Sequence, residues 1–356
     1  MNREVVVLNR ERNVSLTAYL LEVGGEYRGI ARRPLVLVLP GGGYRSCSDR
    51  EADPVALAYL KAGYHAAGLR YSVGVHADWP HPLEDYEQAM EFLKEKAGAW
   101  NIYDDRIAVI GFSAGGHLAA AAATMAKNRP AAAILGYAVA GEDVKCCSPT
   151  APDTVSAVDR RTPPCFLFHT RDDNVVPVMN SIRFMEALAE HDITFESHIY
   201  SYGPHGFSTC DTSVQGPSTR ISRRVPNWVP DSVGWLREVF GDFDDRGEGL
   251  LEPEVRAHLS EDDGQFLSVG CTMGRVMGNP KGAEVLGAVL ARAEGGEAWG
   301  SPLLQAGEMP PEIKRTVDRM LVRDALGFAR IGQDVLEALD RRLGEIPNNV
   351  SKDSGD

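Results

Sequence analysis

Short runs of apolar residues recur along the first two thirds of this 356-residue chain, and they constrain its fold more than any other feature. In most of them nearly every position is apolar, rather than every second one; the runs cover residues 35–39, 65–69, 107–110, 132–136, 165–168 and 196–200. Strands of this kind are typical of a sheet that is covered on both faces. Helical stretches separate them, at residues 54–62, 82–96, 117–127 and 181–190. The alternation predicts an α/β fold with a mostly parallel central sheet flanked by helices.

The pattern changes after about residue 242, and this change divides the chain into regions. We assign residues 1–242 to one α/β domain. Residues 243–263 are predicted to be a linker, because the stretch 241–264 carries nine acidic residues against two arginines, and such a run is usually solvated. Helical patterns return in residues 264–347, which we expect to form a small all-α appendage, and residues 348–356 are expected to be a disordered tail.

The charge and the hydropathy exclude several classes of partner. With 37 Lys and Arg against 50 Asp and Glu, the formal net charge is -13, and no basic block is present to bind a nucleic acid or an anionic membrane. No apolar run reaches the roughly 18 residues that a spanning helix needs, and the N-terminal residues do not resemble a secretory signal. The sequence therefore predicts a cytoplasmic protein without nucleic-acid or membrane partners. It leaves open whether the chain forms a homo-oligomer.

Neither a metal nor a cofactor is expected. The six cysteines form neither a disulfide framework nor a zinc-binding spacing, and the adjacent Cys146 and Cys147 are interpreted as free thiols. The acidic stretch resembles a calcium loop at Asp242 and Asp244, but a cation and a proline replace two of the ligands. The glycine-rich segment 41–43 lacks the Gly-Lys-Ser/Thr that would follow in a phosphate-binding loop.

The strongest functional signal is the sequence Gly111-Phe112-Ser113-Ala114-Gly115, which directly follows an apolar run and precedes an Ala-rich helical stretch. A Gly-x-Ser-x-Gly motif in this setting is typical of a nucleophile elbow. Glycines stand two positions before and two after the serine because a side chain there would strike the neighbouring strand or helix. The motif predicts that Ser113 is a nucleophile whose hydroxyl lies at the positive end of the following helix.

A serine nucleophile needs a base and an acid that orients the base, and in a fold of this kind they follow the serine in the order acid, then histidine. Among the histidines that come after a plausible acid, His205 stands in a glycine-flanked loop after a late strand, so we predict that it is the general base. The acid should follow the strand at 165–168, where Asp172 and Asp173 are adjacent. The residue pattern by itself does not separate these two carboxylates.

Three consecutive glycines, residues 41–43, directly follow the apolar run 35–39. Glycine lets the main chain approach a substrate closely and adopt conformations that are closed to other residues. The transition state of ester hydrolysis carries negative charge on the carbonyl oxygen, and backbone N–H groups stabilise this charge. We therefore predict an oxyanion hole built by Gly42 and Gly43, with the N–H of Ala114 as a further donor.

Four segments of the chain, residues 40–44, 111–117, 169–177 and 204–207, together resemble the α/β-hydrolase superfamily. More narrowly, they resemble the acetylesterase and BD-FAE-like carbohydrate esterases, and the resemblance covers about residues 1–240. It implies an α/β-hydrolase fold, and it aligns the acid of the family with Asp173 rather than Asp172. Tyr44, beside the glycine segment, and Trp79, in a loop near the motifs, are predicted to contact the substrate.

These residues predict a serine esterase that needs no cofactor, and the resemblance implies that it hydrolyses short-chain acyl esters. The resemblance further implies that the substrate is an acetylated carbohydrate such as a xylan-type oligosaccharide. An amidase or peptidase with the same Ser–His–Asp triad is the alternative reaction. A function from another class, in which the helical appendage acts as an interaction module, finds no aromatic platform or charged groove in that region.

Overall fold

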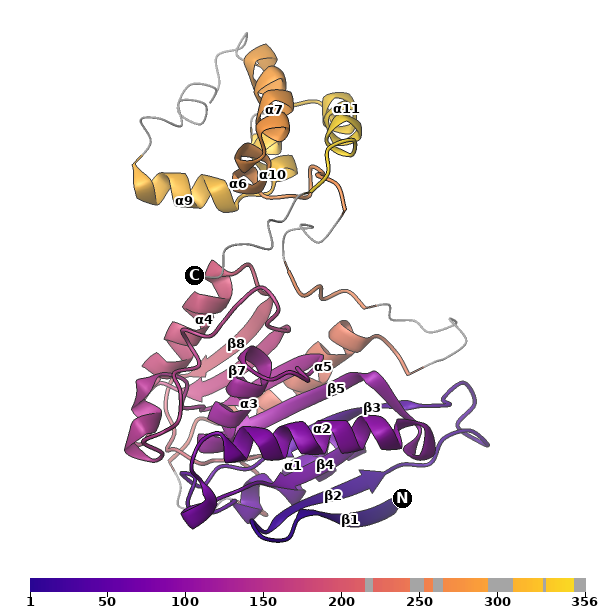
Figure 1. Cartoon of the computed structure of the whole chain (residues 1–356), viewed down its shortest axis with the longest axis vertical. Helices are drawn as coiled ribbons and strands as arrows, with labels where there is room; N and C mark the ends of the chain where they lie inside the picture. Colours follow the sequence, from indigo (N-terminus) through magenta and orange to yellow (C-terminus); the bar gives the residue numbers. More distant parts are fainter. Residues whose placement is uncertain (215–219, 244–252, 259–264, 294–309, 329–330, 349–356) are drawn as a thin grey trace. The chain divides into compact units, whose positions relative to one another are not determined.

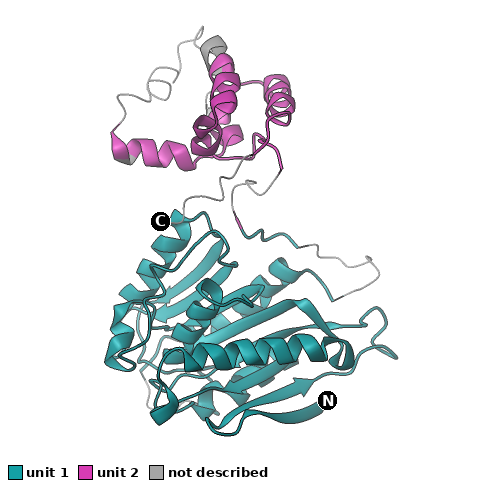
Figure 2. Cartoon of the chain, viewed as in Figure 1, with its two compact units in different colours: residues 1–257 teal, residues 258–356 magenta. Residues whose placement is uncertain are grey.

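The computed structural model describes residues 1–214, 220–243, 253–258, 265–293, 310–328 and 331–348 (Figure 1). The chain divides into two compact units, Met1–Ala257 and His258–Asp356, which Figure 2 shows in different colours. The boundary between the units falls within the range 243–263 that the sequence assigns to a linker. Most of that range, and residues 349–356 of the predicted tail, lie outside the described residues.

An eight-stranded sheet forms the centre of the first unit, in the order β1-β2-β4-β3-β5-β6-β7-β8. The strands are β1 (Asn2–Asn9), β2 (Val14–Leu20), β3 (Arg33–Leu39), β4 (His65–Arg70), β5 (Ile102–Phe112), β6 (Ala132–Gly136), β7 (Cys165–Thr170) and β8 (Phe195–Tyr200). The pairs β1–β2 and β2–β4 are antiparallel, and every other pair is parallel. The predicted mostly parallel sheet is confirmed, and the structure adds the antiparallel hairpin β1–β2, which the apolar runs did not indicate.

Helices cover both faces of the sheet (Figure 1): α1 (Asp53–Lys61), α2 (His81–Trp100), α3 (Ala114–Thr124), α4 (Met179–Glu190) and α5 (Trp228–Phe240). Strand β3 shows how its sequence produces this arrangement. Leu35, Leu37 and Leu39 pack in a buried cluster with residues of α2, α3 and α4, whereas Val36 and Val38 pack in a second cluster with residues of α1 and α5. Because successive side chains of a strand point to opposite faces, a strand covered on both sides is apolar throughout.

Several helix boundaries differ from the sequence prediction by one to four residues. Helix α2 continues to Trp100, beyond the predicted end at residue 96, and α3 begins at Ala114, ahead of the predicted start at residue 117. Gly115 and Gly116 occupy the first turn of α3, and glycine is a poor helix former, so propensity alone favoured a later start. The earlier start matters because it makes the helix begin directly after Ser113.

The second unit is helical, as predicted, with α6 (Met273–Gly278), α7 (Pro280–Ala293), α9 (Pro311–Arg319), α10 (Val322–Phe328) and α11 (Gln333–Leu343). Its helices share a small apolar core of their own, which includes Val276, Leu286, Leu326, Leu339 and Leu343. Throughout the described helices of both units, none combines the length and the apolar character that crossing a membrane requires.

Candidate active site

Ser113 occupies a sharp turn between β5 and α3. Its backbone has φ +54° and ψ -117°, a conformation that costs a non-glycine residue energy and that surrounding structure must hold in place. The two motif glycines make the turn possible. A Cβ atom on Gly111 would lie 2.0 Å from the carbonyl oxygen of Gly115, and one on Gly115 would lie 2.2 Å from the carbonyl oxygen of Leu39. The close packing of β5, α3 and β3 therefore requires glycine at both positions.

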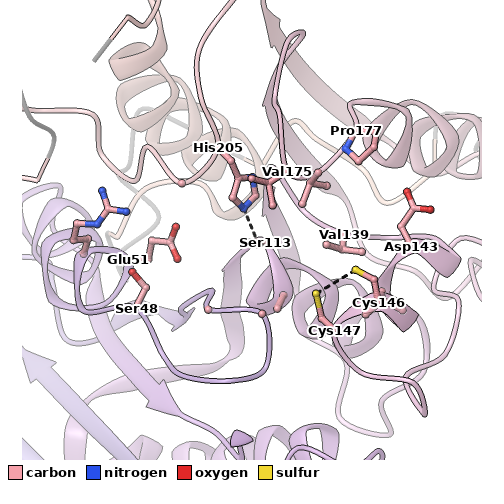
Figure 3. Close-up of a pocket in the computed structure, with 17 residues that line it drawn as sticks. Ser48, Glu51, Ser113, Val139, Asp143, Cys146, Cys147, Val175, Pro177 and His205 are labelled. Carbon is pink, nitrogen blue, oxygen red and sulfur yellow. Dashed lines mark hydrogen bonds between the residues drawn. The ribbon is translucent and has the colours of Figure 1, made fainter. Parts of the chain in front are cut away.

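The carboxyl ends of the parallel strands bring the predicted site residues to one edge of the sheet. Ser113 follows β5, Asp173 follows β7, and His205 follows β8. Nε2 of His205 lies 2.9 Å from Oγ of Ser113, and Nδ1 of His205 lies 2.8 Å from Oδ2 of Asp173. Figure 3 shows the hydrogen bond between Ser113 and His205. Residues that are far apart in the sequence thus form one continuous series of hydrogen bonds.

Asp173 is held as an acceptor by several donors. Its side chain is 0% exposed, and its Oδ1 accepts the backbone N–H groups of Val175 and Val176, each at 2.9 Å. Burial by itself raises the pKa of a carboxyl group, but hydrogen bonds from His169 and His205 outweigh burial and hold the pKa of Asp173 well below its ordinary range. An ionised Asp173 accepts the Nδ1–H of His205, which leaves Nε2 free to accept a proton from Ser113.

The neighbouring Asp172 has a different partner. Its Oδ1 accepts the backbone N–H of Gly203 at 2.7 Å, and Gly203 lies in the loop that carries His205. Asp172 therefore joins the loop after β7 to the loop after β8 by a hydrogen bond, whereas Asp173 contacts the imidazole of His205. The two carboxylates that the residue pattern left unseparated are distinguished by these contacts.

The glycine segment after β3 has the backbone conformations that its sequence suggested. Gly42 and Gly43 have φ +134° and +60°, and a Cβ atom on Gly42 would lie 2.1 Å from the carbonyl oxygen of Ser46. Both line the same pocket as Ser113 and Ala114. Within the described part of the chain, the backbone N–H groups of Gly42, Gly43 and Ala114 donate to no protein acceptor. They are thus available to an oxyanion beside Ser113.

A buried carboxylate, Glu51, supports this segment and was not identified from the sequence. Its Oε2 accepts the backbone N–H of Gly41 at 2.8 Å, and its Oε1 accepts the hydroxyl of Tyr137 at 2.6 Å. The Tyr137 ring in turn packs edge-on against the imidazole of His205, with ring centroids 5.0 Å apart. Glu51 connects the glycine segment 41–43 to the surroundings of His205. Its only sequence signal is its place shortly after the glycines, which does not reveal that it is buried.

Tyr44 and Trp79, the predicted substrate contacts, do not line the pocket. The Tyr44 side chain is 1% exposed, and its hydroxyl donates to Nδ1 of His117 at 2.7 Å, while Nε2 of His117 donates to the carbonyl oxygen of Pro152 at 2.8 Å. Burial lowers the pKa of His117 to about 4, so the neutral imidazole can accept this hydrogen bond. Trp79 packs edge-on against the same imidazole. Both aromatic residues therefore contact His117, and neither faces the pocket.

The pocket beside Ser113 has a volume of about 300 Å³. Figure 3 shows the lining of the pocket on both sides of Ser113. On one side lie Val139, Val175, Cys146, Cys147 and Asp143, and on the other side lie Ser48 and Glu51. Val144 and Val176 add to the apolar lining, and Arg50 adds to the polar lining. Across the described residues, no cluster of three or more His, Cys, Asp or Glu side chains is arranged to hold a metal ion.

Two family models match parts of the chain. The BD-FAE model covers residues 27–138, a range that contains the glycine segment and Ser113. The Phospholipase/Carboxylesterase model covers residues 83–223, a range that contains Ser113, Asp173 and His205. The two matches overlap at the Gly-x-Ser-x-Gly turn.

Two curated relatives and one solved structure are similar to this chain. The chain is 30% identical to endo-1,4-beta-xylanase B of Butyrivibrio fibrisolvens, covering 51% of this chain and 33% of that protein. It is 30% identical to an acetylxylan esterase of Xylanibacter ruminicola, covering 48% of this chain and 40% of that protein. The chain thus spans less than half the length of both relatives.

A crystal structure from a Medee basin deep-sea metagenome library, described as an alpha/beta hydrolase enzyme, is 43% identical to this chain, with a TM-score of 0.63. That match covers 67% of this chain and 97% of the other, so the likeness extends over nearly the whole of the solved chain.

Proposed function

This chain belongs to the α/β-hydrolase family, and on that premise we propose that it is a serine esterase that hydrolyses short-chain acyl esters. One observation carries the proposal. The hydrogen bonds from Ser113 to His205 and from His205 to Asp173, at 2.9 and 2.8 Å, lead from a strained serine to a buried carboxylate beside a pocket. A series of this kind is what nucleophilic catalysis by a serine requires.

The reaction follows from the roles of these side chains. Ser113 attacks the ester carbonyl carbon while His205 takes the proton from its hydroxyl, and ionised Asp173 stabilises the imidazolium. The backbone N–H of Ala114, with that of Gly42 or Gly43, stabilises the oxyanion. His205 then gives its proton to the leaving alcohol, which departs and leaves the acyl group on Ser113. Water repeats the sequence on the acyl-enzyme, releasing the carboxylic acid and the free serine.

The substrate proposed is an acetylated carbohydrate of the xylan type. The pocket of about 300 Å³ is small, and Val139, Val144 and Val176 offer an apolar wall that suits a short acyl group. Ser48 and Asp143 add polar side chains that can hydrogen-bond the hydroxyl groups of a sugar. An acetylxylan esterase among the relatives gives further support.

The test compares purified wild type with Ser113→Ala on p-nitrophenyl esters of increasing acyl length and on acetylated xylo-oligosaccharides. We expect wild type to prefer the acetyl ester, to release acetate from the oligosaccharides, and to lose turnover in the variant. Retained turnover in Ser113→Ala contradicts the nucleophile assignment. Faster cleavage of aminoacyl anilides than of esters would support an amidase or peptidase, and a preference for long acyl chains contradicts the proposed substrate.

A further inference from the structure

The wall of the pocket contains two adjacent thiols, Cys146 and Cys147. Their sulfur atoms lie 3.3 Å apart, and both residues line the pocket that contains Ser113 (Figure 3). The other four cysteines are Cys47, Cys165, Cys210 and Cys271, and none of them lines this pocket. The catalytic steps described above use neither thiol of the pair.

We propose that Cys146 and Cys147 form a site of reversible oxidation by a peroxide, and that the resulting vicinal disulfide slows ester hydrolysis. The chemical step stands on the two thiols alone, whereas its effect on turnover rests on the proposed function of the pocket.

Exposure of the two thiols indicates the order of the steps. Cys146 is exposed and Cys147 is half-buried. The Cys146 thiolate attacks one oxygen of the peroxide, so that its sulfur is oxidised to a sulfenic acid and the other oxygen leaves as water or an alcohol. The sulfur of Cys147 then attacks the sulfenic sulfur, forming the S–S bond and breaking the S–O bond. Its proton and the departing hydroxide form water, so the peroxide receives the two electrons that the thiols lose.

The sequence adjacency of the pair explains why the disulfide should be reversible. Consecutive Cα atoms lie about 3.8 Å apart across a trans peptide, which is shorter than the roughly 4.4–6.8 Å that an unstrained disulfide spans. A disulfide between neighbours is therefore strained, and strained disulfides are reduced more easily than relaxed ones. Small thiols should restore the reduced pair.

Formation of the disulfide changes the wall of the pocket. The sulfurs must approach from 3.3 Å to about 2.05 Å, and the strained ring rearranges the end of the short helix η3 (Glu142–Cys146). The start of η3 is anchored, because Oδ1 of Asn180 accepts the backbone N–H groups of Ala140 and Gly141, each at 3.1 Å. The movement therefore falls on the cysteine end, where Sγ of Cys147 would be 3.9 Å from a Cβ atom on Gly43 of the oxyanion segment.

The test treats the reduced full-length protein with hydrogen peroxide and follows free thiols, intact mass and p-nitrophenyl acetate hydrolysis. We expect free thiols to fall from six to four, the mass to decrease by two hydrogen atoms, and activity to fall by about tenfold or more, because displacements of about 1 Å at a site have effects of this size. Dithiothreitol should restore all three. Peptide mapping should locate the bond between Cys146 and Cys147.

Four variants, two in the pair and two outside it, separate the outcomes. Cys146→Ser and Cys147→Ser should each lose the mass change and the dithiothreitol-reversible inhibition, whereas Cys47→Ser and Cys210→Ser should keep both. Six free thiols after peroxide, or equal reversible inhibition in Cys147→Ser, overturns the inference. A disulfide that forms without changing turnover overturns its effect on hydrolysis. If the reduced protein does not hydrolyse esters, the proposed function fails, while the thiol count and the mass still decide the oxidation step.

Discussion

The two adjacent aspartates of the loop after β7 provide a matched pair of variants. Asp173→Asn and Asp172→Asn each replace one carboxylate oxygen by an amide nitrogen, with almost no change in volume. In the structure, Asp173 contacts His205 and Asp172 contacts the backbone of Gly203. If the proposed mechanism is correct, the first substitution abolishes most turnover and the second does not.

The contacts of Asp173 predict how an asparagine would sit there. Its amide oxygen should keep the place of Oδ1, because the N–H groups of Val175 and Val176 both donate to that position at 2.9 Å. The amide nitrogen then takes the place of Oδ2 and faces Nδ1 of His205. Since both an amide NH₂ and an N–H are donors, the imidazole must accept at Nδ1 and carry its proton on Nε2. A protonated Nε2 cannot take the proton of Ser113.

The expected loss in kcat is about 10⁴-fold, the size known for the same change in a serine triad, and it corresponds to about 5 kcal/mol of transition-state stabilisation. An asparagine at position 172 still has an oxygen to accept the N–H of Gly203. We therefore expect Asp172→Asn to lower kcat by less than about tenfold, the range of one weakened hydrogen bond.

The assay measures kcat and KM of both variants on p-nitrophenyl acetate near pH 7.5, with thermal unfolding as the control for folding. Equal losses in the two variants, or more than about a tenth of wild-type kcat in Asp173→Asn, would refute the tautomer argument. A large loss confined to Asp172→Asn would instead assign the acid to the other carboxylate.

Three further predictions concern support and stability. Glu51→Gln should lower kcat on p-nitrophenyl acetate by about 10- to 100-fold with a smaller change in KM, because an amide oxygen can accept only one of the two hydrogen bonds that Glu51 accepts from Gly41 and Tyr137. An unchanged kcat contradicts the inference that Glu51 supports the glycine segment 41–43. Gly115→Ala should destabilise the fold by about 3 kcal/mol or more in urea denaturation, because the new Cβ would lie 2.2 Å from a backbone carbonyl oxygen. Gly98→Ala, in an open part of α2, should instead stabilise the fold by about 0.5–1 kcal/mol. Burial lowers the pKa of both His65 and His117 to about 4, below the value near 6.5 of an unfolded chain, so the folded state binds fewer protons than the unfolded state. The free energy of unfolding should therefore be highest above about pH 6.5 and fall as the pH decreases towards 4. A constant free energy of unfolding across this window argues against neutral buried histidines.

Local pattern was sufficient to predict the main features of the first unit. An apolar strand that is buried on both faces differs visibly from an amphipathic one, so the parallel sheet could be predicted from residues such as those of β3. The turn at Ser113 was predictable because the backbone segments approach so closely at Gly111 and Gly115 that only glycine, which has no Cβ, fits there. His205 could be selected because it stands in a glycine-flanked loop after a late strand.

Only the tertiary structure shows which distant groups meet. Asp172 and Asp173 are chemically identical, so the residue pattern did not separate them and the choice of Asp173 rested on the family resemblance; in the structure, Asp173 contacts the imidazole of His205 and Asp172 contacts a backbone N–H. Glu51 looks like a surface acid until the fold encloses it against Gly41 and Tyr137. Tyr44 lies beside the oxyanion segment in sequence, yet its ring is buried against His117.

The physical reason for this division is the range of the interactions involved. Backbone sterics and strand periodicity act over a few residues, so the sequence alone determined the nucleophile turn and the covered sheet. Hydrogen bonds and burial join residues that are distant along the chain, and their partners exist only after β5, β7 and β8 align their carboxyl ends. The contact of Asp173 with His205, the contact of Glu51 with Gly41 and the thiol-lined wall of the pocket are properties of that assembled edge.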